Sequence, residues 1–183
     1  TVGRSLSIKE GEVANVSRME LGVHAGTHMD APLHFIDGGK DMASLDINRF
    51  FGKALVVCSD SEEIGEEVFE GHDLKGFKAV FFKTRSSGRD ENTPAWDVYP
   101  AINEACARYM INRGILTVGI DYMSIELSRD NRFPVHRLLL GNEVAIVESL
   151  CLKDIEPGEY DYICLPMKIA GADGSPARVL LIK

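Results

Sequence analysis

The sequence lacks any long uninterrupted apolar segment. Its longest apolar runs, at residues 54–58 and 179–182, are far shorter than the roughly 20 residues that a helix needs to cross a bilayer. The first residues contain no basic stretch followed by an apolar core, so nothing in them resembles a secretory signal. We therefore expect a cytoplasmic protein that does not insert into a membrane.

Cysteines and basic clusters are also scarce. The four cysteines include no CxxC pair, and three of them lie in apolar runs, which favours buried free thiols in a reducing compartment. The four are Cys58, Cys106, Cys151 and Cys164. The net charge of −8 and the absence of a Lys/Arg cluster argue against a nucleic-acid partner, because phosphate binding needs a basic face. Small molecules and other protein subunits remain as partners.

The composition is that of one ordinary folded domain. The 183 residues are 45% hydrophobic and 26% charged, and no repeat, low-complexity tract or Pro/Gly/Ser linker divides them. We therefore expect a single domain that spans residues 1–183.

Short apolar runs that are typical of strands alternate with two helical patterns. We expect strands near residues 54–59, 79–83, 115–120, 144–148, 162–167 and 179–182. One helix is predicted from about Pro100 to Arg113, ended by Gly114, and a shorter one over residues 134–140, opened by Pro134 and closed by Gly141. This interleaving predicts an α/β fold.

Three of the five histidines, His24, His28 and His34, fall in one stretch of eleven residues, HAGTHMDAPLH. Asp30 lies between them. Imidazole nitrogen and carboxylate oxygen are the usual ligands of zinc and similar ions, and catalytic sites combine three protein ligands with an open position. His24, His28 and Asp30 could supply such a set.

The spacing restricts the local backbone. Gly26 and Pro32 argue against a regular helix, and a straight strand would place His24 and His28 about 13 Å apart, too far for one ion. We therefore expect the chain to curl at Gly26, with Thr27 bonding within the turn or orienting a ligand. The alternative is a polar loop whose histidines only satisfy local hydrogen bonds, and the clustering favours the metal site over it.

The segment from His24 to Phe35 resembles the HxGTHxDxPxHF signature of the cyclase family, which includes metal-dependent kynurenine formamidases and isatin hydrolases. The resemblance implies that His24, His28 and Asp30 bind one metal and that His34 is the acid/base catalyst. It also implies a mixed, barrel-like β-sheet core with flanking helices, of the swivelling β/β/α type. It further implies a homodimer or homotetramer, and zinc or sometimes manganese as the metal.

A second pair of residues matches the two-metal members of this family. A later histidine and a glutamate twelve residues further on complete their second site, and His136 and Glu148 reproduce this interval. Glu148 ends an apolar run, where a charge is costly to bury unless something positive compensates it. Taken alone, each has a simpler interpretation, as a histidine near a helix start and as a solvent-facing strand end. Together with the signature they indicate a second ion.

Two departures from the family bear on specificity. The N-terminal strand and the Pro/aromatic-rich loop that family members carry before the equivalent of Thr1 are not present, and we expect that this piece is missing. Residues 119–126, GIDYMSIE, replace a loop that ends in Asp-Pro in the formamidases. A later loop with Gly171, Asp173 and Pro176 is expected near the site, or is a plain turn.

These observations predict a hydrolase that cleaves a small aryl formamide such as N-formylkynurenine, with metal-activated water as nucleophile and His34 as acid/base. Isatin-like cyclic amides and lactones are alternative substrates. A non-catalytic metal-binding domain is a different class, which the presence of His34 disfavours, since a closed structural site needs no proton carrier. A cupin-like barrel is disfavoured because a His-x-His pair is absent.

Overall fold

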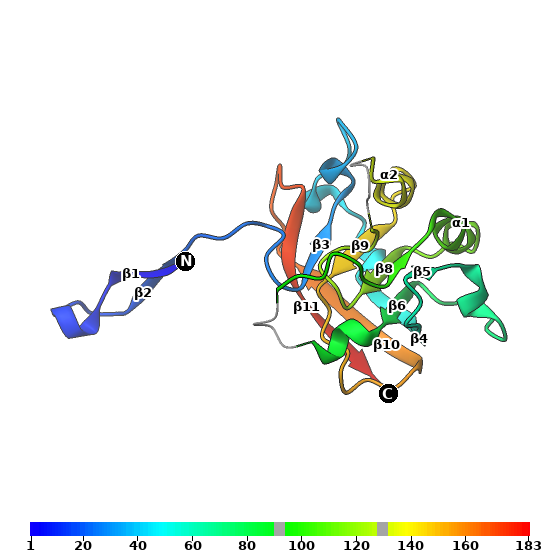
Figure 1. Cartoon of the computed structure of the whole chain (residues 1–183). Helices are drawn as coiled ribbons and strands as arrows, with labels where there is room; N and C mark the ends of the chain where they lie inside the picture. The colour runs from blue at the N-terminus through cyan, green and yellow to red at the C-terminus, as the bar shows by residue number, and fades with distance from the viewer. Residues whose placement is uncertain (90–93, 128–131) are drawn as a thin grey trace.

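The computed structural model describes residues 1–89, 94–127 and 132–183. Seven strands close a barrel in the order β10-β11-β3-β9-β8-β6-β4 (Figure 1). Their bounds are β3 His28–Asp30, β4 Phe51–Cys58, β6 Ala79–Lys83, β8 Thr117–Ile120, β9 Ala145–Glu148, β10 Gly158–Pro166 and β11 Gly174–Ile182. The α/β class and the mixed, barrel-like core that the sequence predicts are confirmed.

The barrel has a parallel part and an antiparallel part. Strands β4, β6, β8 and β9 are neighbours and run parallel, whereas β10, β11 and β3 pair antiparallel and close the ring between β4 and β9. The helices α1 (Glu104–Asn112) and α2 (Pro134–Gly141) lie together on one side of the barrel (Figure 1). A small parallel pair, β5 (Glu63–Ile64) with β7 (Ala101–Ile102), lies beside them.

Side chains that alternate along the strands form two cores. In β4, Leu55 and Val57 belong to the core that packs against the helices, whereas Ala54 and Val56 belong to the core inside the barrel. This period of two is what a strand buried on both faces requires. The barrel interior is therefore filled by side chains, and the site has to lie at its rim.

The first helix begins later than the sequence predicts. Pro100 lies before the helix and Ile102 belongs to β7, and α1 begins at Glu104. The side chain of Asn103 accepts a hydrogen bond from the amide of Cys106 at 2.9 Å, which makes Asn103 the N-cap. Ile102, whose spacing fits the apolar face of the predicted helix, is therefore part of strand β7. The second helix is confirmed, with Pro134 in its first turn.

The prediction for the cysteines is only half right. All four are free thiols, but Cys58 and Cys151 are exposed and only Cys106 and Cys164 are buried. Cys58 ends β4 and Cys151 follows β9, so both lie where a strand leaves the barrel. Among the described residues, no helix combines the length and the apolar character needed to cross a membrane.

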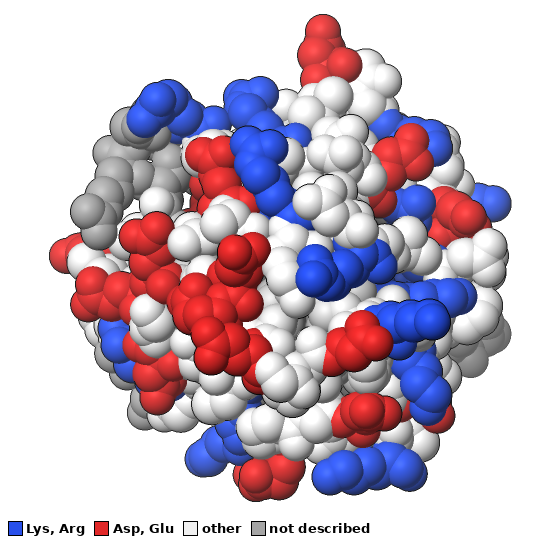
Figure 2. Space-filling model, turned by 90° about the vertical axis from the view of Figure 1, so that its right-hand side faces the viewer, with Lys and Arg blue, Asp and Glu red and all other residues white. Residues whose placement is uncertain are grey.

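The N-terminal segment is a ribbon that projects from the barrel (Figure 1). Its strands β1 (Val2–Leu6) and β2 (Val16–Met19) pair antiparallel, and every residue of both is exposed. On the opposite side, the face nearest α1 carries one cluster of acidic side chains, and acidic and basic side chains are interspersed over the rest of it (Figure 2). An acidic cluster of this kind bears on solubility and association, and it says nothing about the fold.

Candidate metal centre

The segment that carries the predicted ligands is a turn followed by a short strand. Gly26 has φ 65°, a left-handed conformation that glycine adopts without strain, and the chain turns at this residue just before β3. Thr27 then donates a hydrogen bond to the carbonyl of Ser149 at 2.6 Å, which ties the turn to the end of β9. The predicted curl at Gly26 is confirmed, and Thr27 bonds across to β9 instead of within the turn.

Strand β3 presents His28 and Asp30 on one side, between two neighbouring strands. His28 pairs in register with Glu148 of β9, and Asp30 pairs with Gly174 of β11. Gly174 leaves room for the ring of His24, because a Cβ there would lie 2.7 Å from the ring carbon Cε1. A residue without a side chain therefore allows the histidine of the turn to fold back onto the strand.

The nitrogen and oxygen atoms of the predicted ligands converge. Asp30 Oδ1 lies 2.8 Å from His24 Nδ1 and 3.4 Å from His28 Nε2. Glu148 lies 3.5 Å from His28 Nε2 through Oε2 and 3.2 Å from His136 Nε2 through Oε1. Two atoms that bind one ion at 2.0–2.2 Å lie roughly 3 to 3.5 Å apart, so these separations fit a coordination sphere. Two overlapping ligand groups share Asp30: one with His24 and His28, the other with His136 and Glu148.

Each of the three histidines is also held through its other ring nitrogen. His28 Nδ1 contacts the carbonyl of Gly26 at 2.8 Å. His136 Nδ1 contacts Glu126 Oε1 at 2.7 Å, and His24 Nε2 contacts Asp173 Oδ2 at 2.8 Å. Metal-binding histidines usually donate their second N–H to a carboxylate or carbonyl in this way, because it fixes the tautomer and orientation of the ring. This pattern favours a metal site over a polar loop.

The two carboxylates of the centre are buried, and one oxygen of Asp30 is left without a donor among the described residues. Asp30 is 1% exposed, and its Oδ2 atom has no hydrogen-bond partner among the described residues. Glu148 is 5% exposed, and its ionic contacts in the described chain are to histidines. An unpaired buried carboxylate oxygen is costly, and a divalent cation would compensate it. The residues present therefore fit a metal.

The pKa values of two histidines also show that the buried carboxylates favour a positive charge next to them. Burial opposes the charged form of His28, but hydrogen bonds to Asp30 and Glu148 raise its pKa to about 10. Burial likewise opposes charge on His136, and Glu126 and Glu148 raise its pKa to about 9. The histidines thus carry protons that a metal ion would displace.

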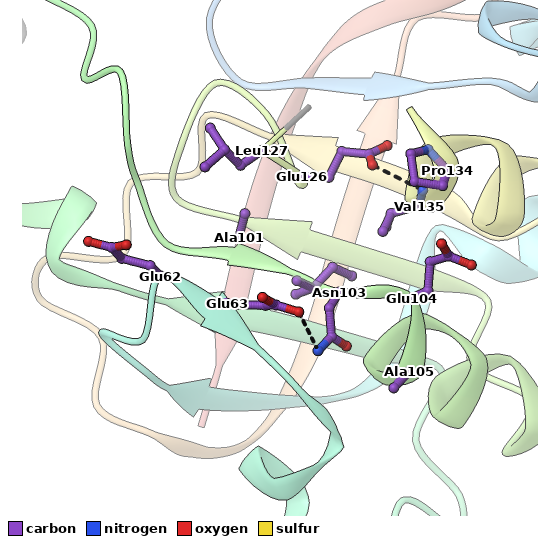
Figure 3. Close-up of a pocket in the computed structure, with 11 residues that line it drawn as sticks. Glu62, Glu63, Ala101, Asn103, Glu104, Ala105, Glu126, Leu127, Pro134 and Val135 are labelled. Carbon is purple, nitrogen blue, oxygen red and sulfur yellow. Dashed lines mark hydrogen bonds between the residues drawn. The ribbon is translucent and has the colours of Figure 1, made fainter. Parts of the chain in front are cut away.

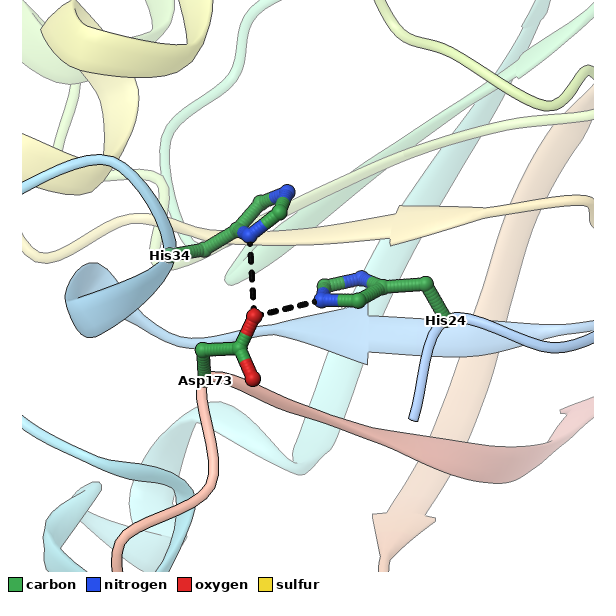
Figure 4. A group of neighbouring side chains, drawn as sticks. All are labelled: His24, His34 and Asp173. Atoms are coloured by element: carbon green, nitrogen blue, oxygen red, sulfur yellow. Dashed lines mark hydrogen bonds and ion pairs between the residues drawn. The ribbon is translucent and has the colours of Figure 1, made fainter. Parts of the chain in front are cut away.

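His34 lies at the edge of this group, in a different environment. Its Nδ1 contacts Asp173 Oδ2 at 3.0 Å, and its ring centroid lies 4.0 Å from that of His24 (Figure 4). Within the described part of the chain, its Nε2 makes no hydrogen bond. Burial lowers the pKa of His34 below 6.5 against the opposing effect of Asp30, so the ring is neutral near pH 7 and can accept a proton.

Two residues of the centre were not assigned a role from the sequence. Glu126 is 3% exposed and accepts hydrogen bonds from the amides of Val135 and His136 at the start of α2, besides its contact with the His136 ring. Asp173 precedes β11 and contacts two histidine rings. Glu126 lies in the segment 119–126 that departs from the formamidases, and Asp173 lies in the loop expected near the site. Neither has a spacing that would have identified its partner.

A cavity of about 620 Å³ adjoins the centre (Figure 3). Glu126 belongs to both, because it lines this cavity and holds His136. The other acidic lining residues are Glu62, Glu63 and Glu104, and the described lining includes no histidine or cysteine. The groups that can bind a metal and carry a proton therefore lie outside this cavity, and we place the chemistry at the histidine cluster.

Comparison with known proteins agrees with this centre. Residues 5–127 match the family model described as "Putative cyclase". The chain is 32% identical over 178 residues to a kynurenine formamidase of Bacillus cereus, covering 97% of this chain and 84% of the relative. The kynurenine formamidase of Bacillus mycoides is 33% identical over 168 residues, with 91% and 79% covered.

Solved structures give the same grouping. A structure described as a potential metal-dependent hydrolase with cyclase activity superimposes with a TM-score of 0.83 at 33% identity, covering 98% of this chain and 85% of that one. Isatin hydrolase A from Labrenzia aggregata superimposes with a TM-score of 0.85 at 22% identity, covering 100% and 82%, a likeness of fold. The chain therefore belongs to the cyclase family of metal-dependent hydrolases.

Proposed function

We propose that this protein hydrolyses the C–N bond of a small amide, most readily an aryl formamide of the N-formylkynurenine type. The reaction would take place at a metal centre held by His24, His28, Asp30, His136 and Glu148. One observation carries the proposal: ligand atoms from a turn, two strands and a helix converge on the buried carboxylate of Asp30, whose second oxygen has no partner in the described part of the chain.

The donor set supports a borderline divalent cation. Three imidazoles and two carboxylates suit zinc, and manganese is the alternative. His24, His28 and Asp30 would hold one ion, and His136 with Glu148 would hold a second one that shares Asp30. A divalent cation supplies Lewis-acid chemistry there, since it acidifies water and polarises a carbonyl oxygen.

The chain's own residues supply the proton transfers. His34 is neutral near pH 7, and its Nε2 makes no hydrogen bond to the described residues, so it can take a proton from water and return it to the leaving nitrogen. The products are then formate and a free amine. Glu126 keeps His136 turned toward Glu148, and the carbonyl of Gly26 keeps His28 turned toward Asp30. The rings need no reorientation as the charge on the substrate changes.

The relatives support the choice of substrate. Those of Bacillus cereus and Bacillus mycoides are kynurenine formamidases, which act on an aryl formamide by name. Isatin hydrolases share the fold at lower identity, so a cyclic amide of that kind, or a lactone, is the alternative substrate. We further propose that the protein works in the cytoplasm as a homodimer or homotetramer, with no nucleic-acid or membrane partner. Light scattering of the purified protein tests the subunit count.

Two variants test the assignment of the centre. The His34→Ala protein should keep its metal and lose most of its turnover, because it lacks only the proton carrier. The His28→Ala protein should lose metal as well as turnover. Each is assayed with N-formylkynurenine, isatin and simple lactones, and its metal is measured by elemental analysis. Normal turnover in His34→Ala contradicts the acid/base role, and full metal content in His28→Ala contradicts the ligand set. A wild-type protein inactive on every substrate would indicate a non-catalytic metal-binding domain.

A further inference from the structure

One carboxylate oxygen joins the candidate metal ligands to the candidate proton carrier. Asp173 Oδ2 lies 2.8 Å from His24 Nε2 and 3.0 Å from His34 Nδ1, and the two rings lie side by side with 4.0 Å between their centroids (Figure 4). The other ring nitrogen of His24 contacts Asp30. Asp173 is therefore the one described residue whose side chain bonds both rings.

The position of Asp173 is fixed by the backbone on both sides. Its carbonyl accepts a hydrogen bond from the amide of Ala31 at 2.9 Å, in the residue that follows β3. Gly174, the next residue, pairs with Asp30 and admits the His24 ring. The loop before β11 thus holds the carboxylate against the turn and the strand that carry the ligands, although 149 residues separate it from His24.

We propose that Asp173 is a positioning residue that sets the tautomers of His24 and His34 together. A carboxylate is an acceptor only, so both rings must donate to Oδ2: His24 through Nε2–H and His34 through Nδ1–H. In the zinc-loaded protein, His24 would then present its bare Nδ1 to the metal beside Asp30. His34 presents its bare Nε2 as the base. The inference rests on the proposed function only in calling this nitrogen a base.

The consequences of changing Asp173 follow from this bonding. Asparagine has the same shape, but its oxygen is uncharged and accepts more weakly than a carboxylate, and its NH₂ group can occupy the place of Oδ2, where it would donate to the rings. In the zinc-loaded Asp173→Asn protein, we expect kcat to fall on the order of 10- to 100-fold, as is usual when an outer partner of a metal-binding histidine is lost. KM should change less, because Asp173 orients the rings and does not bind the substrate. Asp173→Glu, which keeps the carboxylate, should recover part of the loss.

A spectroscopic readout separates this role from a structural one and needs no substrate. In zinc-loaded protein labelled with ¹⁵N-histidine, long-range ¹H–¹⁵N spectra should show His34 with its proton on Nδ1. In Asp173→Asn, part or all of that population should carry the proton on Nε2. Asp161→Asn is the matched control, because within the described residues the side chain of Asp161 forms a surface pair with Lys53, 3.3 Å away, and contacts no candidate ligand. This variant should leave the tautomer and kcat unchanged.

Each outcome of these measurements either supports or overturns the positioning role of Asp173. A changed His34 tautomer with full zinc content supports the proposal, even if the wild-type protein hydrolyses none of the amides tested. An unchanged tautomer in both Asp173→Asn and Asp173→Ala, the latter of which has no acceptor at this place, overturns it. Loss of a zinc ion from Asp173→Asn even at saturating Zn²⁺ also overturns it, because His24, His34 and Asp173 would then be ligands of a separate ion.

Discussion

A methyl group added at Gly174 should displace His24 and weaken metal binding. The new Cβ would lie 2.7 Å from Cε1 and 3.1 Å from Nε2 of the His24 ring, and 3.1 Å from the carbonyl oxygen of Met29. The backbone carbonyl belongs to β3 and cannot move freely, so the ring has to yield. To reach the 3.4 Å at which ordinary contact begins, Cε1 must retreat by about 0.7 Å.

That displacement is large for a metal ligand. Ligand positions tolerate about 0.2 Å, so the ring leaves the coordination sphere or distorts it. We expect Gly174→Ala to lower the affinity for Zn²⁺ on the order of 10- to 100-fold, the usual effect of disturbing the orientation of a ligating histidine. The assay is a competition titration of metal-free protein with Zn²⁺ and a chromophoric chelator. Thermal unfolding is followed alongside.

Gly119→Ala is the matched control. Its Cβ would lie 2.7 Å from Phe81 Cδ1 and 2.8 Å from Leu150 Cδ1, so it crowds the barrel to a similar degree without touching a candidate ligand. Both variants should lose about 1–3 kcal/mol of stability from overpacking, but only Gly174→Ala should lose affinity for Zn²⁺. In a His24→Ala background the added methyl should have no further effect on binding. Wild-type affinity in Gly174→Ala would refute the placement of His24 as a ligand.

Three further predictions concern stability. Glu126→Ala should lower the free energy of unfolding by about 1–3 kcal/mol in urea titrations, because two buried amides of α2 and the His136 ring lose their acceptor; an unchanged midpoint would argue against this role. Chelation should lower the melting temperature and Zn²⁺ should restore it, because the ligands converge only in the folded chain; calorimetry without any shift would contradict the metal centre. Burial raises the pKa of the Cys164 thiol from 9.0 to about 12, so its contribution to stability should be complete below pH 9 and be lost as the pH rises toward 12. The free energy of unfolding, measured by denaturation at several pH values in that range, should fall less steeply with pH in Cys164→Ala than in the wild type. An equal pH dependence in the two proteins would exclude the contribution.

The sequence predicted the parts of this protein that depend on local patterns. The strands predicted at residues 79–83 and 115–120 are rich in apolar residues and form β6 and, from Thr117, β8, and α2 is opened by Pro134, so propensity and burial favour the same result. The start of α1 was misplaced because Ile102 fits both a helical face and a strand. Its pairing with Ile64, which decides between them, is a contact between distant segments.

The residues of the candidate site were likewise predicted in part: some were identified from the sequence, and others became evident only from the fold. His24, His28, Asp30 and His34 were found because they are close in sequence, and His136 and Glu148 because the family resemblance implies such a pair twelve residues apart. Glu126 and Asp173 were not assigned, because an acidic residue in a loop is ordinary until the fold shows what it contacts. The exposed strands β1 and β2 were not predicted either, since they bury no face that would impose alternation on the sequence.

Strand β3 is only three residues long, yet it closes the ring by pairing with both β9 and β11. Its partners lie more than a hundred residues away along the chain, so this seam depends on the slowest kind of contact to form during folding. Three of the candidate metal ligands, His28, Asp30 and Glu148, lie on that seam. A refolding chain should therefore begin to bind Zn²⁺ only when the ring closes, after the parallel strands have assembled. The bound ion would then stabilise the closed barrel.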